Sequence, residues 1–117
     1  IEHSYERFHD YERLMQLNYF APVRLTLALL PQMVARGEGH VVNVSSIGVL
    51  SNAPRFSAYV ASKAAFEAFS RCAAAEYRGA GVAFTVVNMP LVRTPMIAPT
   101  RIYEQMPTIG AEEAAEM

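Results

Sequence analysis

Residues 40–46 read His-Val-Val-Asn-Val-Ser-Ser, a short and mostly apolar run that is rich in β-branched residues. Such a run is typical of a parallel strand that is buried on both faces. A second apolar run, residues 82–89, follows after Gly79 and Gly81. We therefore predict two parallel strands as the centre of the fold.

Two long helices are predicted around these strands. Apolar residues recur at helical spacing over residues 9–36, where Gly37 and Gly39 end the pattern. Residues 57–78 are rich in alanine and form the second helix, with Ser57 as a candidate N-cap. Residues 47–56 are expected to be a loop. A proline-rich loop follows the second strand, and residues 111–116 suggest the start of another helix.

The order α-β-α-β predicts an α/β protein, because two parallel strands need a crossover helix between them. We expect a partial Rossmann-like, doubly wound parallel sheet. In such sheets the functional crevice lies beyond the carboxyl ends of the strands. Ser45 and Ser46 end the first strand, residues 88–94 follow the second, and Tyr59 begins the crossover helix. Three separate segments should therefore meet at one edge of the sheet.

Composition excludes several classes of protein. Hydrophobic residues make up 52% and charged residues 18% of the 117 residues, so we expect a packed domain or a piece of one rather than a disordered chain. The net charge of −1 and the lack of a basic cluster do not suggest nucleic acid as a partner. No apolar run reaches the roughly 18 residues of a transmembrane helix. The single cysteine, Cys72, fits a reducing compartment, so a cytoplasmic location is expected.

Tyr59 and Lys63 are the first candidate site residues. They are four residues apart, which places them on one face of a helix. Lys63 is the only lysine among ten basic residues. An ammonium beside a phenol lowers the phenol pKa from about 10 and makes it a possible proton donor and acceptor. A chance pair of tyrosine and lysine on a helix is the alternative.

Asn18 is a further candidate because of Pro22. A proline inside a helix cannot donate to the carbonyl four residues earlier, which here belongs to Asn18. A kink would leave that acceptor facing water or a ligand. A tolerated proline whose partner carbonyl is satisfied by solvent is the alternative. The histidines His3, His9 and His40 lack metal-ligand spacing, so no metal site is predicted.

Taken together, these residues resemble the short-chain dehydrogenase/reductase family. The resemblance rests on Asn18, the strand ending in Ser46, the segment Tyr59-Val-Ala-Ser-Lys63 and residues 88–96. Tyr59 lies thirteen positions after Ser46. The resemblance covers nearly all of residues 10–97. The whole chain, 1–117, is interpreted as the C-terminal catalytic portion of one Rossmann-like reductase domain.

The resemblance implies a role for each of these residues. Tyr59 would exchange a proton with the substrate oxygen while nicotinamide exchanges a hydride with its carbon. Lys63 would lower the pKa of Tyr59 and hold the nicotinamide ribose. Ser46 would orient the substrate oxygen, and the main-chain carbonyl of Asn18 would hold a water in a proton relay. The implied cofactor is NADP or NAD, with NADP slightly favoured, and its further contacts would be Pro90, Val92 and Thr94.

Two departures from the family pattern stand out. The family usually has Pro-Gly after the second strand, whereas Pro90 is followed by Leu91, which predicts an altered local contact. The glycine-rich turn that cradles a pyrophosphate is absent, because both glycine pairs precede strands. The N-terminal glycine-rich βαβ half is therefore expected to lie outside this chain.

These considerations predict an NAD(P)-dependent oxidoreductase that interconverts a carbonyl and an alcohol. Residues 88–100 are similar to reductases of actinobacterial type that act on fatty acyl or fatty aldehyde substrates, and an apolar lid would suit such a substrate. The alternatives are a non-catalytic reductase-like dimerisation module, or a piece that is inactive alone. A homodimer or higher homo-oligomer through the two long helices is expected, because a two-stranded sheet cannot bury their apolar faces.

Overall fold

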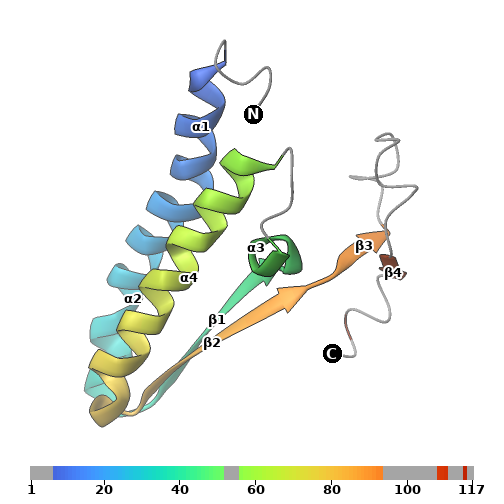
Figure 1. Cartoon of the computed structure of the whole chain (residues 1–117). Helices are drawn as coiled ribbons and strands as arrows, with labels where there is room; N and C mark the ends of the chain where they lie inside the picture. Colours follow the sequence, from blue (N-terminus) through green and yellow to red (C-terminus); the bar gives the residue numbers. More distant parts are fainter. Residues whose placement is uncertain (1–6, 52–55, 94–107, 111–114, 116–117) are drawn as a thin grey trace.

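The first long helix runs without interruption but changes its winding. The computed structural model describes residues 7–51, 56–93, 108–110 and 115. Helix α1 (Phe8–Met15) leads into a π-helical segment, η2 (Gln16–Phe20), and then into α2 (Ala21–Arg36) (Figure 1). Gly37 ends it in the left-handed conformation with φ 75°, a common helix C-terminal signal. The predicted helix over residues 9–36 is therefore confirmed.

The π-helical segment lies directly before Pro22. The amide of Ala21 donates to the carbonyl of Gln16, a bond that spans five residues instead of four. Pro22 is thus at the start of α2, where a missing amide hydrogen is best tolerated. The structure places a π-helical turn where the sequence predicts a kink. Pro31 is the proline inside α2, and the sequence analysis did not use it.

The two predicted strands pair in parallel along their whole length. Strand β1 (Gly39–Ser46) and strand β2 (Val82–Met89) run in register from the pair Gly39 and Val82 to the pair Ser46 and Met89. Helix α4 (Ser57–Tyr77) joins them. The helices lie together on one side of the strands (Figure 1), and both α2 and α4 contact β1. The α/β class and the partial Rossmann-like sheet are confirmed.

The connection between β1 and α4 differs from the prediction. Residues 47–56 were expected to be a loop, but a short helix, α3 (Ile47–Ser51), begins directly after β1. The Ser46 hydroxyl accepts a hydrogen bond from the Gly48 amide at 3.1 Å, which stabilises this first turn. Ser57 is not the N-cap of α4, because Phe56 occupies that position. The Ser57 hydroxyl instead hydrogen-bonds the Tyr11 phenol at 2.9 Å.

Glycines bring the amino ends of the strands together. A short 3₁₀ helix, η3 (Arg78–Ala80), ends at Gly81, whose φ is 80°. The Gly39 amide donates to the Gly81 carbonyl at 3.2 Å. A Cβ atom at Gly81 would lie only 2.1 Å from the Gly37 carbonyl oxygen. This close approach occurs at the amino ends of the two strands, whereas Ser46 is at the carboxyl end of β1. Neither glycine pair therefore contributes to the candidate site.

A second small sheet follows β2. Strand β3 (Leu91–Arg93) pairs in parallel with β4 (Thr108–Gly110), where the sequence predicts only a proline-rich loop. Three-residue strands this far apart in sequence leave too little local pattern to be predicted. Of the helix expected over residues 111–116, only Ala115 lies within the described residues, where it is helical.

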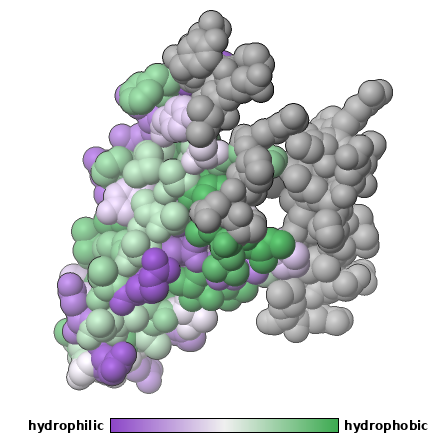
Figure 2. Space-filling view, viewed as in Figure 1, coloured by the Kyte–Doolittle hydropathy of each residue, from purple (hydrophilic) through white to green (hydrophobic). Residues whose placement is uncertain are grey.

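Much of the buried interior is polar. In the described part of the chain the buried apolar residues are Leu30, Phe66, Ala73 and Val82, whereas the buried polar ones are Thr26, Asn43, Ser45, Ser62, Glu67 and Ser70. Large apolar residues stay exposed, including Leu17 and Leu25 at 62% each. Figure 2 shows hydrophobic surface around α3 and the strands. Among the described helices, none is long and apolar enough to cross a membrane.

Candidate functional site

The candidate site residues and the neighbouring Asn88 come from four elements: β1, β2, α4 and the π-helical segment η2. Ser46 is the last residue of β1, and Asn88 precedes the last residue of β2. Tyr59 and Lys63 occupy the first two turns of α4. Asn18 is in the π-helical segment, which contacts α4. The predicted convergence is supported for Lys63 and Asn88, whose side chains hydrogen-bond the main-chain carbonyls of Val44 and Ser46 on β1, and it stays a prediction for Tyr59.

Ser45 and Ser46 point to opposite sides of the strand, as the alternation of a strand requires. Ser45 is 5% exposed, and its hydroxyl is buried without a hydrogen-bond partner among the described residues. Ser46 is only half-buried, and its hydroxyl oxygen accepts the Gly48 amide hydrogen. That bond leaves the Ser46 hydroxyl hydrogen free to be donated to another group. Of the two serines, Ser46 is the accessible one.

Lys63 is anchored to the neighbouring strand. Its Nζ donates a hydrogen bond to the main-chain carbonyl of Val44 at 3.1 Å. Partial burial lowers the pKa of the Lys63 amine from its ordinary value, and the negative charge of Glu67 acts in the opposite direction. An ammonium carries three N–H donors, so two remain for other partners. The amine is thus fixed in position while part of its hydrogen-bonding capacity is unused.

Tyr59 lies one turn before Lys63 on α4 and is half-buried. Its main-chain carbonyl accepts a hydrogen bond from the Ser62 hydroxyl at 2.8 Å. Ser62 is fully buried, and its oxygen also accepts the Asn18 side-chain amide at 3.1 Å. A chain of two hydrogen bonds therefore ties the π-helical segment to the turn that carries Tyr59 and Lys63.

Asn18 is thus connected to the site, but by its side-chain amide and not by the main-chain carbonyl that was expected. The sequence predicts a role for its main-chain carbonyl, whereas the structure gives its side-chain amide a partner, Ser62. The π-helical turn changes the main-chain ladder at this point. The role of the Asn18 carbonyl in a water relay stays a prediction, as does the lowered pKa of Tyr59.

Glu67 was not among the site residues predicted from the sequence. This residue is only 3% exposed, and its Oε1 accepts a hydrogen bond from the Asn88 side-chain amide at 2.8 Å. The same Asn88 nitrogen donates to the main-chain carbonyl of Ser46 at 3.3 Å. The available signal was spacing: Glu67 follows Lys63 by four residues, as Lys63 follows Tyr59. A carboxylate on that face of an apolar helix requires a partner.

The predicted cofactor contacts are only partly within the described residues. Pro90 is half-buried directly after β2. Val92 belongs to β3, and only its place in that strand is described. Thr94 lies outside the described residues. These three assignments therefore stay predictions.

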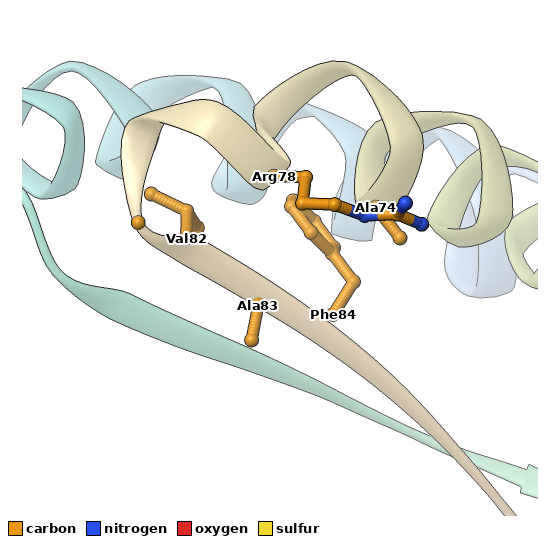
Figure 3. A pocket seen from close by; sticks show the side chains of 6 residues that line it. Ala74, Arg78, Val82, Ala83 and Phe84 are labelled. Carbon is orange, nitrogen blue, oxygen red and sulfur yellow. The ribbon is translucent and has the colours of Figure 1, made fainter.

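A hollow of about 420 Å³ lies elsewhere on the molecule (Figure 3). The residues that line it come from the end of α4, from η3 and from the start of β2: Ala74, Arg78, Gly81, Val82, Ala83 and Phe84. Because β2 begins at Val82 and ends at Met89, the hollow is at the opposite end of the strand from the candidate site. It is therefore separate from Ser46, Tyr59 and Lys63.

These features define an α/β protein in which a serine ends β1 at the carboxyl edge of a parallel sheet and a lysine is anchored to the same strand, with a tyrosine one helical turn from the lysine. The model of the short chain dehydrogenase family matches residues 3–105. The chain belongs to this family.

Named relatives agree with this assignment. The chain is 61% identical over 117 residues to a fatty acyl-CoA reductase of Acinetobacter baylyi, covering 100% of this chain and 40% of that protein. The structure of a short-chain dehydrogenase from Streptomyces avermitilis is 38% identical with a TM-score of 0.69, covering 86% of this chain and 35% of that one.

A short chain dehydrogenase from Burkholderia cenocepacia, solved in complex with NADP, is 27% identical with a TM-score of 0.76. The match covers 87% of this chain and 41% of that one. The chain thus spans between 35% and 41% of the length of these three relatives.

Proposed function

We propose that the protein carrying this chain is an NAD(P)-dependent oxidoreductase that interconverts a carbonyl and an alcohol. The main support is the anchored Lys63 amine, held by Val44 on the strand that ends in Ser46. Tyr59 is one turn from this amine on the same helix. Membership of the short chain dehydrogenase family supports the same reaction class.

The residues present fit one end of a nicotinamide dinucleotide. Lys63 retains two N–H donors beyond its bond to Val44, which suits the hydroxyl groups of a ribose. When bound, the nicotinamide supplies or accepts the hydride. Pro90, Val92 and Thr94 would contact this end. In the described residues the left-handed glycines, Gly37 and Gly81, are at the far edge of the sheet, so the pyrophosphate must be held by other residues.

Each residue at the edge then has one task. Tyr59 donates a proton to the carbonyl oxygen during reduction and accepts it during oxidation. Lys63 stabilises the phenolate by its positive charge. Ser46 donates its free hydroxyl hydrogen to the same substrate oxygen. The Asn18 carbonyl holds the water through which Lys63 is reprotonated. The cofactor NADP is slightly preferred to NAD, in line with a 27% identical dehydrogenase solved with NADP.

A long-chain aldehyde or fatty acyl group is the proposed substrate class. This proposal is supported by the 61% identity to a fatty acyl-CoA reductase. The alternative is a non-catalytic dimerisation module. The exposed Leu17 and Leu25 favour dimerisation, which an enzyme can also show. A non-catalytic module does not explain why Lys63 and Glu67 are partly or fully buried together near the strand ends.

Replacement of Tyr59 by Phe tests the proposal in the full-length protein. We expect turnover of dodecanal with NADPH, followed as loss of NADPH absorbance, to fall at least about 100-fold in Tyr59→Phe. Tyr77→Phe is the matched control, because Tyr77 is also half-buried on α4 but lies against Phe84. Equal rates for Tyr59→Phe and wild type would refute the catalytic assignment. Faster turnover of propanal than of dodecanal would refute the long-chain substrate.

A further inference from the structure

Glu67 is a buried carboxylate for which the proposed mechanism has no use. It is 3% exposed, on the face of α4 that packs against the sheet. One carboxylate oxygen, Oε1, accepts the Asn88 amide at 2.8 Å, whereas Oε2 is buried without a hydrogen-bond partner among the described residues. Burial of a carboxylate with an unpaired oxygen is costly. A helix retains such a group only if the surroundings depend on it.

Asn88 connects this carboxylate to the end of β1. Its Nδ2 carries two hydrogens, and the structure uses both: one is donated to Glu67 and the other to the Ser46 carbonyl at 3.3 Å. Asn88 is the register partner of Ser45, next to Ser46. Glu67 therefore fixes the orientation of an amide that holds the main chain at the candidate catalytic serine.

Glu67 also lies one helical turn from Lys63. The two side chains are four residues apart on α4, and the Lys63 amine donates to Val44 rather than to the carboxylate. Their interaction is therefore between a buried carboxylate and a partly buried amine, where solvent screens the charges less than at an open surface. Partial burial lowers the pKa of Lys63, and the charge of Glu67 raises it.

The other groups near this pair are uncharged. Among the described residues, Glu67 is the charge that acts on the Lys63 amine. The groups that the packed elements present there are amides, hydroxyls and a carbonyl: Asn18 from η2, Asn43, Val44 and Ser45 from β1, Asn88 from β2 and Tyr59 from α4. No other described carboxylate can replace Glu67 in this role.

We propose that Glu67 is a positioning residue of the candidate site, which orients Asn88 against the end of β1 and places a carboxylate one helical turn from the Lys63 amine. Its contacts do not depend on the proposed function, but its effect on turnover does. Glu67 touches neither the substrate nor the cofactor in this proposal. It acts through Asn88 on Ser46 and through space on Lys63.

The first experiment measures the Lys63 charge without any turnover. Lysine labelled with ¹³C at Cε is titrated by NMR in the full-length protein, and the Lys63 signal is assigned by its loss in Lys63→Arg. Glu67→Gln keeps an oxygen that can accept from Asn88 but removes the charge. We expect its Lys63 midpoint to fall by about one pH unit. Glu76→Gln is the matched control, because Glu76 is exposed on the same helix, and its midpoint should not move.

The second experiment separates the charge from the contact. Glu67→Asp keeps the charge but withdraws the carboxylate from Asn88 by one methylene. We expect kcat with dodecanal to fall about tenfold with KM within about threefold, while the Lys63 midpoint moves much less than in Glu67→Gln. Circular dichroism checks that each variant is folded, and Glu67→Asp alone still decides the contact if Glu67→Gln does not fold.

The outcomes are distinct. An unchanged Lys63 midpoint in folded Glu67→Gln overturns the electrostatic role, and an unchanged kcat in folded Glu67→Asp overturns the contact role. Loss of stability without either change would mean that Glu67 is only part of the packing, which also overturns the proposal. If the wild-type protein reduces no aldehyde, the proposed function fails, whereas the NMR titration still tests Glu67.

Discussion

Three glycines near the amino ends of the strands allow a graded test of the packing. Gly37 and Gly81 both have positive φ, 75° and 80°. A Cβ atom at Gly37 or Gly79 meets nothing within 4 Å, whereas one at Gly81 lies 2.1 Å from the Gly37 carbonyl oxygen. Alanine at each position therefore adds a different combination of backbone strain and steric overlap.

The expected costs follow from this geometry. Gly79→Ala adds neither strain nor overlap, so we expect the free energy of unfolding to change by less than about 0.5 kcal/mol or to rise slightly. Gly37→Ala adds only the left-handed strain, about 1–2 kcal/mol. Gly81→Ala adds that strain and an overlap with main-chain atoms that cannot rotate away, so we expect at least about 3 kcal/mol.

Urea denaturation of the full-length protein, followed by circular dichroism, measures these differences as shifts of the midpoint at constant m-value. The predicted order of stability is Gly79→Ala, then Gly37→Ala, then Gly81→Ala. Equal losses for Gly37→Ala and Gly81→Ala would refute the close approach of the two turns. A large loss in Gly79→Ala would refute the claim that open space surrounds that position.

Three further predictions concern the candidate site and the surface. Ser62→Ala should lower the free energy of unfolding by about 1–3 kcal/mol in urea denaturation, because it leaves the Asn18 amide without its buried acceptor; an unchanged midpoint would contradict this. Burial lowers the folded-state pKa of Lys63 below its unfolded value of 10.5. Below the folded-state pKa the charged amine lowers the free energy of unfolding by its full amount, and stability rises as the pH goes from the folded-state pKa towards 10.5. Lys63→Met should therefore gain stability over wild type at pH 7 and lose that gain as the pH approaches 10.5, as measured by urea midpoints; a gain independent of pH would contradict the burial argument. The exposed Leu17 and Leu25 predict a homodimer or larger assembly at micromolar concentration, and sedimentation as a monomer would contradict it.

The strands and the long helices could be predicted because their signals are local. Residues 82–89 form a run between Gly81 and Pro90 that is apolar except for Thr85 and Asn88, and β2 has those bounds. Gly37 ends the first helix because it readily adopts positive φ. The place of Ser46 at the carboxyl edge followed from strand order, since parallel strands end at one edge, and the four-residue spacing placed Tyr59 one turn from Lys63.

The features that could not be predicted depend on contacts between distant segments. The π-helical turn at 16–20 differs from an α-helix in a main-chain bond that side-chain periodicity does not report. Ser57 loses its expected capping role because Tyr11, far away in sequence, engages its hydroxyl. Glu67 reads as an ordinary helix carboxylate until Asn88 is brought against it.

The interior between α4 and the sheet is built largely from directional bonds, and this has a mechanical consequence. Dispersion contacts are individually weak and need no single partner atom, whereas a hydrogen bond requires its own donor and acceptor at a set distance. Any slip of α4 along the sheet would break the bonds of Lys63 to β1 and of Glu67 to β2, and Ser62 of the same helix is also held by Asn18 of η2. The crossover helix is therefore expected to move with the strands as one stiff body.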